Sequence, residues 1–539
     1  MAGITRDHFK RAAADIGAHG DNDTLPFDID NRFVKDKQDE LVEIAYTLSS
    51  ELAKGNGKNA VHAIDSATIF SERLMAPAGP SGFRIVTKIH PFWSIYFNGL
   101  GVAIAEALEP NRSERAHSYR FMPHGDELFD REASWRAYRR ATISSPYRKD
   151  AVIVQTDISS FYEHISHHRI ENCVSDLFPA DGTIAAQIDR ILSRLASGRS
   201  FGLPVGGQGS RVLAELLLSM VDQQLDDARI DWRRYVDDFV LITPSHAEAY
   251  RAISILSHAL ADYGLTLNRT KTTLLSAKHY ADYVQTQLGL TGKEGQSLLE
   301  IDLHFDPYSD NPDEEFEELR GIVESLDITK LLDLELSKAQ PDTFLVAQIS
   351  RTLRLHKPGV ALQLCRTLLS QSNLHAFRAS WSTIMRGVAA VRGDQTFESI
   401  SRGLDTLLDE IPGHSSHLLM AEASALHYLR TLRFAKTSAR AKHVRQTYTE
   451  AKSHTVKRAC IDCWRHWKDR ASFTKQRNQW NALSAEEQRM LWLSAAGFGD
   501  EGDKFRKQVA RSAEQAWKLG IERANKPTFA SVFASWEAV

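Results

Sequence analysis

The sequence predicts an α+β half followed by an all-α half, and two observations carry that prediction. In the first 290 residues, short apolar stretches typical of strands, at 83–86, 151–156 and 240–242, alternate with longer helical patterns. From about residue 316 onwards the apolar residues follow helical spacing, with little strand-like alternation. Turn residues interrupt this second half near Pro341, Pro358, Pro412 and Gly499. No fixed repeat is visible, so we expect an irregular helical array.

Length and composition are those of an ordinary soluble protein with two or three domains. The chain has 539 residues, 42% hydrophobic and 25% charged, and its net charge of −3 argues against a protein that coats nucleic acid by bulk charge. Four cysteines indicate a reducing compartment without a disulfide framework. The start lacks the apolar segment of a signal peptide, and no run of about 18 apolar residues occurs, so we expect a cytoplasmic protein without a membrane partner.

The first elements are two helical segments with a strand between them. Helical apolar spacing runs through residues 30–75, and a helix with proline in its first turn is expected from Pro91 to Leu108. The strand at 83–86 lies between them and is followed by Lys88.

A short β-like stretch follows at 118–121, and it places Arg120 among aromatic residues. Arg120 is either an exposed strand cation or a contact to a triphosphate, for which the planar guanidinium is well suited.

The most informative stretch is 235–239, which carries Asp237 and Asp238 at a tight turn before the apolar run 240–242. Adjacent carboxylates repel each other, and a divalent cation would offset that repulsion through its preference for oxygen ligands. The alternative is a solvated hairpin turn. Asp157 ends the buried strand 151–156, where a carboxylate should have a partner, and a helix is expected to start near Ser159 or Ser160.

Two further stretches surround these acids. Four glycines within residues 202–209 allow the backbone to approach a ligand closely, and a helix is expected from Val212 to Leu225. Gly264 reads as a helix stop, and Lys271 after it is either a plain surface residue or a contact to a leaving pyrophosphate.

In order and spacing, these stretches resemble the palm and fingers of a reverse transcriptase over roughly residues 30–290. The residues that carry the resemblance are Asp157 with Tyr162, Gly202-Leu203-Pro204 with Gly206, Tyr235-Val236-Asp237-Asp238, and Gly264-Leu265 with Asn268 and Lys271. Together with 118–120, the stretch from Pro204 to Glu215 looks like the bacterial abortive-infection and defence-associated members, which carry a helical C-terminal extension. Val205 stands where retroviral and intron enzymes usually have Gln, which puts ordinary templated fidelity in doubt.

The resemblance implies a right-hand polymerase fold with fingers and palm at 1–290, a thumb or linker at 291–340 and an α-helical domain at 341–539. It also implies a nucleotidyltransferase that uses two Mg²⁺ ions, with Mn²⁺ as a substitute. The metal ligands would be the catalytic carboxylates of Asp157, Asp237 and Asp238 and the carbonyl of Ile158. The nucleotide contacts would be Lys88, Arg120, Phe161, Tyr162, Val205, Gly206 and Lys271. Tyr162 stands at the family's steric gate against a ribose 2′-hydroxyl; the alternative is a core aromatic beside Phe161.

The C-terminal half contains a basic segment between Arg430 and Arg477 with a net charge of +11 and interleaved aromatic residues. Such a segment is typical of single-stranded nucleic-acid binding, and the alternative is a helical face paired with the acidic patch at 306–318 or with another subunit. The candidate contacts are Arg440, Lys442, Arg445, Lys457, Arg458, Trp464 and Trp467. Because some relatives prime synthesis on the protein itself, Tyr428 and Tyr448 are candidates by location.

The leading functional hypothesis is an RNA-directed or template-independent DNA polymerase acting in bacterial defence against phage. Its expected partners are dNTPs, an RNA template or single-stranded DNA product, a non-coding RNA and further copies of the chain. Two alternatives remain: an effector that binds nucleic acid or a phage protein while its palm only senses nucleotide, and an intron-type maturase.

Overall fold

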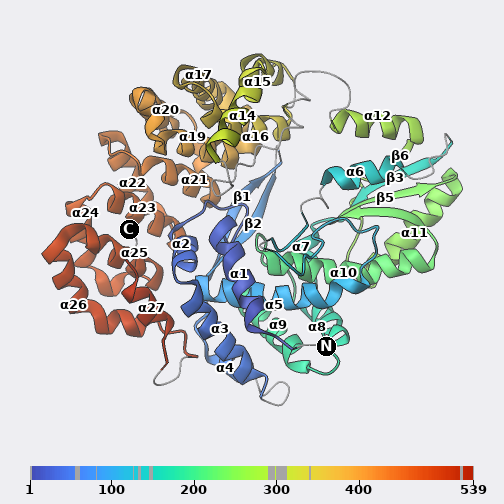
Figure 1. Cartoon of the computed structure of the whole chain (residues 1–539), viewed down its shortest axis with the longest axis horizontal. Coiled ribbons are helices and arrows are strands. Elements are labelled where there is room, and N and C mark those ends of the chain that lie inside the picture. Colours follow the sequence, from blue (N-terminus) through green and yellow to red (C-terminus); the bar gives the residue numbers. More distant parts are fainter. Residues whose placement is uncertain are drawn as a thin grey trace.

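The computed structural model describes residues 3–54, 61–79, 82–125, 127–130, 135–144, 150–288, 298, 312–338, 341–521 and 526–537. The α+β half and the helical half predicted from the sequence are both present, side by side (Figure 1). No helix among these residues is both long and apolar enough to cross a bilayer.

A four-stranded antiparallel sheet in the order β4-β5-β3-β6 lies at the centre of the α+β half. Its strands are β3 (Val152–Asp157), β4 (Asp231–Tyr235), β5 (Asp238–Thr243) and β6 (Thr273–Ser276). The apolar run of β3 is buried between β5 and β6, while β4 and β5 form the hairpin predicted around Asp237. The strand that ends at Asp157 therefore lies directly beside the hairpin that carries Asp237 and Asp238.

Helices cover both faces of this sheet. Helix α11 (His246–Ala261) contacts β3 and β5, and α10 (Gln208–Asp227) contacts β4, while α6 (Trp135–Ser144) and α12 (Ala277–Gln287) contact β4 and β3. The other helices of this half are α1 (Arg6–His19), α2 (Ile29–Asp36), α3 (Gln38–Leu52), α4 (His62–Ser66), α5 (Pro91–Leu108), α7 (Phe161–His164), α8 (His167–Leu177) and α9 (Gly182–Leu195). Helix α5 has the predicted bounds and is buried along nearly its whole length.

A second, two-stranded sheet joins the two halves. It consists of β1 (Ser71–Ala78) and β2 (Gly82–Ile89), paired antiparallel. Glu72 in β1 accepts hydrogen bonds from the amides of His454 and Thr455 at the start of α23 (His454–His466), each at 2.8 Å. Negative charge at a helix N-terminus is favourable, so this contact stabilises the junction with the C-terminal half.

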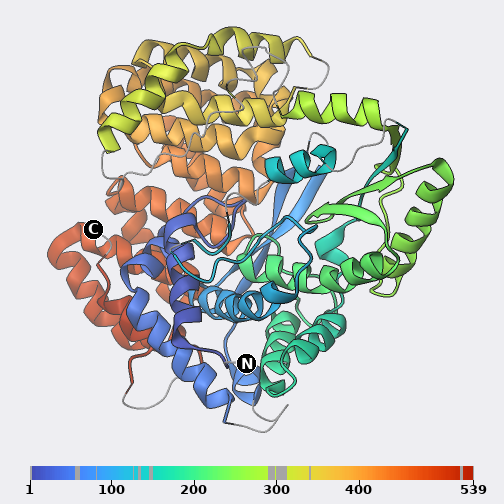
Figure 2. The same ribbon diagram turned by 45° about the vertical axis from the view of Figure 1, so that its right-hand side comes forward.

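The C-terminal half is helical throughout its described residues and wraps around one side of the α+β half (Figures 1 and 2). Its helices are α14 (Pro312–Glu324), α15 (Ile328–Leu336), α16 (Thr343–Arg351), α17 (Pro358–Leu369), α18 (Gln371–Ala376), α19 (Trp381–Gly393), α20 (Ser401–His414), α21 (Glu422–Leu432), α22 (Ser438–Glu450), α23 (His454–His466), α24 (Arg470–Arg477), α25 (Ala485–Ala495), α26 (Gly499–Ala516) and α27 (Phe529–Ser535). The chain ends against its own beginning, since Phe33 of α2 packs on Phe529 and Phe533 of α27.

Two local predictions need correction. The stretch 118–121 is a turn, not a strand, because Arg112 donates to the carbonyls of Ser118 and Tyr119 at 2.7 and 2.8 Å and holds the chain folded back. The helix after Asp157 begins at Phe161, because Ser160 adopts the left-handed conformation with φ of 47°. The predicted thumb or linker at 291–340 and the acidic patch at 306–318 lie partly outside the described residues.

Candidate active site

The three predicted carboxylates lie together at one end of the central sheet. The register of β3 and β5 places Asp157 directly opposite Asp238, and Asp237 is hydrogen-bonded to the Asp157 side chain. Burial, the charge of Asp157 and that hydrogen bond raise the pKa of Asp237 to about 8. Burial and Asp157 also raise the pKa of Asp238. Burial and the neighbouring carboxylates therefore favour the protonated form of Asp237.

The turn that carries Asp237 is held in a strained conformation from behind. Val236 has a φ of 55°, which is uncommon for a β-branched residue. Its carbonyl accepts from Arg234 Nη1 and its amide donates to Ser118 Oγ, each at 2.9 Å. Arg234 is fully buried and paired with Asp222 and Glu215. A buried ionic network thus fixes where the carboxylates point.

Lys271 lies at the carboxylates themselves. Its Nζ is 2.5 Å from Asp157 Oδ2, and the hydrogen bond raises the pKa of Lys271. No three His, Cys, Asp or Glu side chains enclose a metal position within the described ranges. The donor set of three clustered carboxylates still fits a hard divalent cation, which would take the place of the proton on Asp237.

This arrangement predicts a pH-dependent metal affinity. A metal must displace the proton that Asp237 holds below a pKa of about 8, so Mg²⁺ or Mn²⁺ should bind several-fold more tightly at pH 8.5 than at pH 6.5. Thermal stabilisation by each ion across this range measures the effect. The Asp237→Asn variant should lose most of the stabilisation, and an equal metal shift at both pH values would contradict the assignment.

A cavity of about 390 Å³ opens beside Asp237 and Asp238. Four of the predicted nucleotide contacts line it, namely Phe161, Tyr162, Val205 and Gly206. Phe161 is buried, and Tyr162 is half-buried, with the two ring centroids 5.2 Å apart. Tyr162 thus packs on Phe161 and also lines the cavity, and both interpretations of this residue stay predictions.

Gly206 is required at this wall for two reasons. Its φ is 120°, and a Cβ there would lie 2.1 Å from the side-chain nitrogen of Asn22. The close approach of Asn22 was not visible in the sequence, because it comes from a segment more than 180 residues away.

The structure does not place Lys88 and Arg120, two of the predicted nucleotide contacts, at this cavity. Lys88 is 3% exposed, and its ammonium lies 2.9 Å from Asp21 and 3.0 Å from Asp28. Arg120 pairs with Glu109 at 2.7 Å and donates to two backbone carbonyls. Each cation is already neutralised within the protein. Strand alternation offered a warning, because Lys88 shares a face of β2 with the buried Val86.

Two arginines that were not among the predicted nucleotide contacts, Arg84 and Arg211, lie at this cavity. Both line the cavity, together with Asp23, Tyr119 and Trp135. Arg211 pairs with Asp23 at 2.6 Å. The side chain of Arg84 is exposed and makes no ion pair or hydrogen bond in the described part of the chain. Arg84 is therefore the better candidate for a triphosphate contact. In the sequence, its place on the same predicted strand, four residues before Lys88, could have indicated it.

In the C-terminal basic segment, four predicted contacts are inaccessible. Arg440, Arg458 and Trp464 are 1, 4 and 5% exposed, and the Tyr428 hydroxyl is buried and donates to Leu408 O at 2.6 Å. Arg440 is neutralised by Asp405 and Asp409. Nucleic-acid contact through the first three and priming on Tyr428 are thus corrected.

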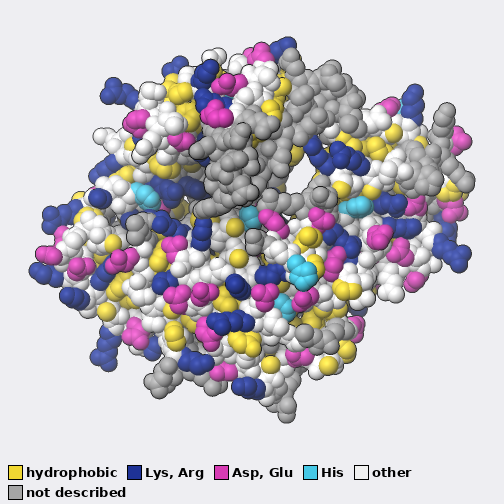
Figure 3. Space-filling view, viewed as in Figure 1, with side chains coloured by type: hydrophobic (Ala, Val, Ile, Leu, Met, Phe, Trp, Pro, Cys, Tyr) yellow, Lys and Arg dark blue, Asp and Glu magenta, His cyan; other side chains and the backbone are white. Residues whose placement is uncertain are grey.

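The remaining candidates of that segment reach the surface at least in part. Lys442 and Arg445 on α22 are exposed, and Lys457 and Trp467 are half-buried. The Tyr448 hydroxyl, the other priming candidate, donates a hydrogen bond to Glu487 at 2.8 Å or to Gln476 at 3.1 Å, so it already has a partner within the protein. Over the face seen in Figure 3, Lys and Arg side chains are interspersed with Asp and Glu.

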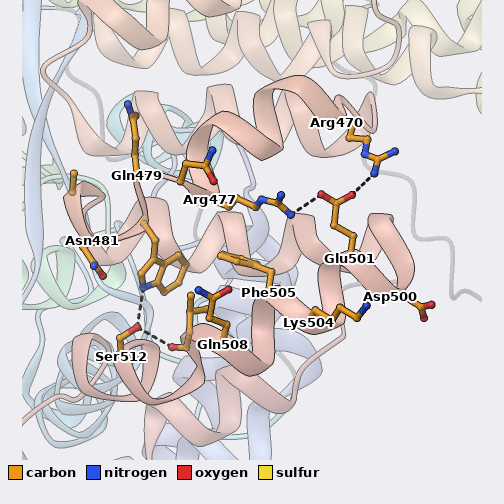
Figure 4. Close-up of a pocket in the computed structure, with 14 residues that line it drawn as sticks. Arg470, Arg477, Gln479, Asn481, Asp500, Glu501, Lys504, Phe505, Gln508 and Ser512 are labelled. Atoms are coloured by element: carbon orange, nitrogen blue, oxygen red, sulfur yellow. Dashed lines mark hydrogen bonds and ion pairs between the residues drawn. The ribbon is translucent and has the colours of Figure 1, made fainter.

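A second cavity of about 1430 Å³ lies in the C-terminal half, between α24 and α26 (Figure 4). Its two arginines, Arg470 and Arg477, both pair with Glu501, and Trp480 donates to Ser512 at 2.9 Å. The charges of these two arginines are therefore already neutralised by Glu501 within the protein.

Comparison with known proteins is consistent with the geometry at the sheet. Residues 92–292 match the family model described as reverse transcriptase (RNA-dependent DNA polymerase). No curated protein matched the chain.

Similar solved structures include three telomerases. One is from Candida albicans in complex with a fragment of telomeric RNA, with 13% identity, 68% of each chain covered and a TM-score of 0.32. Apo telomerase from Candida tropicalis has 13% identity, 68% of this chain and 69% of the other covered, and a TM-score of 0.30. A form of the latter truncated from the C-terminal domain has 14% identity, 40% and 54% covered, and a TM-score of 0.29.

Proposed function

We propose that this chain, which carries a reverse transcriptase domain over residues 92–292, is a DNA polymerase that acts in bacterial defence against phage. The observation that carries the polymerase proposal is the convergence of Asp157, Asp237 and Asp238 beside a cavity of nucleotide size. The defence role, the domain boundaries at 290 and 340, and assembly into homo-oligomers rest on the sequence resemblance.

In the proposed reaction, Asp157, Asp237, Asp238 and the Ile158 carbonyl would hold the divalent cations, Mg²⁺ or Mn²⁺. Such ions neutralise charge on the triphosphate and activate the attacking 3′-hydroxyl. Lys271, whose ammonium lies at Asp157, would interact with the leaving pyrophosphate. Arg84 binds the triphosphate from the other wall of the cavity. The template or single-stranded product follows the exposed cations Lys442 and Arg445.

The test is nucleotide incorporation by purified protein with Mg²⁺ and each dNTP, with and without an RNA template, followed by sequencing of the product. Templated copies, homopolymer and random sequence are easily distinguished. If no DNA forms with either metal while labelled dNTP still binds, the nucleotide-sensing effector is the better description.

Tyr162 is expected to exclude ribonucleotides, because its ring lies in the wall of the nucleotide cavity. Tyr162→Ala should raise ribonucleotide incorporation relative to deoxyribonucleotide by about 10-fold or more, a difference of about 1.4 kcal/mol. Tyr162→Phe keeps the ring and should discriminate like the wild type. Competition between a dNTP and its rNTP measures both variants, and unchanged discrimination in Tyr162→Ala would leave Tyr162 as a packing residue.

A further inference from the structure

Residues 21–28, here called the strap, connect α1 to α2 and contact three parts of the molecule. On one side they meet strand β2, where Lys88 pairs with Asp21 and Asp28. On a second side they meet the Val205–Gly206 wall of the nucleotide cavity, and on a third the C-terminal helices. The N-terminal helices lie between the sheet and the C-terminal half in Figure 1.

Asn22 fastens the strap to the cavity wall. Its side-chain nitrogen donates to Val205 O at 3.1 Å and to Thr87 O at 3.3 Å, and its oxygen accepts from Thr24 N at 3.0 Å. Asn22 is 4% exposed, so these bonds replace water that the side chain would otherwise have. The amide of Asp23 donates to Gly206 O at 3.3 Å. The position of the wall is therefore set by the strap.

Asp23 extends the strap into the cavity itself. Its carboxylate pairs with Arg211 at 2.6 Å, and both residues line the cavity together with Asp237 and Asp238. Arg211 also lies over the Tyr119 ring, 5.1 Å from its centroid. A shift of the strap would therefore move Asp23 and Arg211, two charged residues at the cavity proposed to bind the nucleotide.

The C-terminal half holds the strap from outside. Arg386 of α19 donates to Asp23 O at 2.7 Å, and His427 of α21 bonds to Thr24 O at 2.8 Å. Burial lowers the pKa of His427 to about 3, and a carbonyl only accepts, so the neutral ring donates from Nε2. Consecutive carbonyls of the strap are thus fixed by two different helices.

We propose that the C-terminal half shapes the nucleotide cavity through the strap, with Asn22 and Arg386 as positioning residues that set nucleotide affinity and sugar discrimination. This inference rests on the proposed polymerase function. Neither residue lies among the reacting groups, so loosening the strap lets the Val205 wall recede from the nucleotide without disturbing the carboxylates. Loosening the strap should therefore change KM for the nucleotide and the preference for dNTP over rNTP more than it changes kcat.

The experiment uses the full chain and compares variants that keep or lose a donor. Asn22→Asp preserves shape and the bond from Thr24 but sets a carboxylate against two carbonyls. Arg386→Met removes the donor, and Arg386→Lys keeps one. Arg402→Met, an exposed cation on α20, is the matched control. Because Arg386 is exposed, its variants should fold, and circular dichroism checks this.

We expect KM for dNTP to rise about fivefold or more in Asn22→Asp and about two- to fivefold in Arg386→Met, with kcat within about twofold of wild type. Arg386→Lys and Arg402→Met should match wild type, and dNTP over rNTP preference should fall in the first two variants. Unchanged KM in folded Arg386→Met, or a loss confined to kcat, would overturn the inference. If the wild type makes no DNA, the polymerase proposal fails, and the Kd of a fluorescent dNTP then tests the strap by the same comparison.

Discussion

Asp237→Ala and Asp157→Ala should each reduce DNA synthesis by about 10³-fold or more, equivalent to about 4 kcal/mol of transition-state stabilisation. The reason is electrostatic. Phosphoryl transfer depends on neutralising and positioning the triphosphate, and the two side chains share one site at the ends of β3 and β5. Losing either leaves too few oxygen ligands for a pair of cations.

Neutralising Asp237 should stabilise the metal-free protein at high pH. The pKa of Asp237 is raised to about 8 in the folded protein from an ordinary value of 3.8, so this group costs stability as pH rises through that window. Asp237→Asn removes the cost, and its melting temperature at pH 8.5 without metal should exceed that of the wild type.

The measurement pairs initial rates of dNTP incorporation with thermal melts on the same preparations. Asp262→Asn, an exposed carboxylate at the end of α11, is the matched control and should change neither quantity. A wild-type rate of dNTP incorporation in Asp237→Ala would contradict the assignment of this site as the active site. A fall in both rate and stability would indicate a structural role for Asp237 instead of a catalytic one.

Secondary-structure elements with strong local patterns could be predicted from the sequence, whereas contacts between residues distant in the sequence could not. The Asp157 strand and the Asp237 hairpin have strong local patterns that predicted each element by itself, and the structure shows that they pair. The bounds of α5 followed from Pro91 and its long apolar run. These signals are local, so the chain expresses them before any tertiary contact is known.

Charged residues were placed less well, because their positions depend on partners distant in sequence. Lys88 is turned inward by Asp21 and Asp28, and Arg458 by residues some 430 positions earlier. Nothing within ten residues of Arg440 distinguishes it from Arg445, yet one is buried beside Asp405 and the other exposed. A basic stretch on an amphipathic helix predicts that some cations are exposed, but not which ones.

The partners of Arg458 carry the second large effect. Arg458 pairs with Asp28, Asp30 and, at 3.1 Å, Glu486, all on elements that join the α+β half to the C-terminal half. Lys88 and Arg489 complete a buried cluster in which three cations face Asp21, Asp28, Asp30 and Glu486. Removing one cation from such a cluster leaves carboxylates without water or partner.

Arg458→Met should therefore destabilise the protein by about 3–5 kcal/mol at pH 7.5. The charge of Arg458 holds the pKa of Asp30 far below its usual value despite burial, and without it that pKa should rise. The variant's deficit should then shrink as pH falls from 7.5 to 5, because a protonated Asp30 no longer needs the guanidinium. A loss of packing alone would show no such pH dependence.

Urea unfolding of wild type and variant at the two pH values separates these explanations. Arg458→Met combined with Asp30→Asn should recover part of the stability, since the uncompensated charge is removed with its partner. Lys457→Met is the matched control: this neighbour is half-buried over the Tyr448 ring and outside the cluster, so its loss should cost about 1 kcal/mol or less. An equal deficit at both pH values, with no recovery in the double variant, would mean that this ionic cluster does not hold the two halves together.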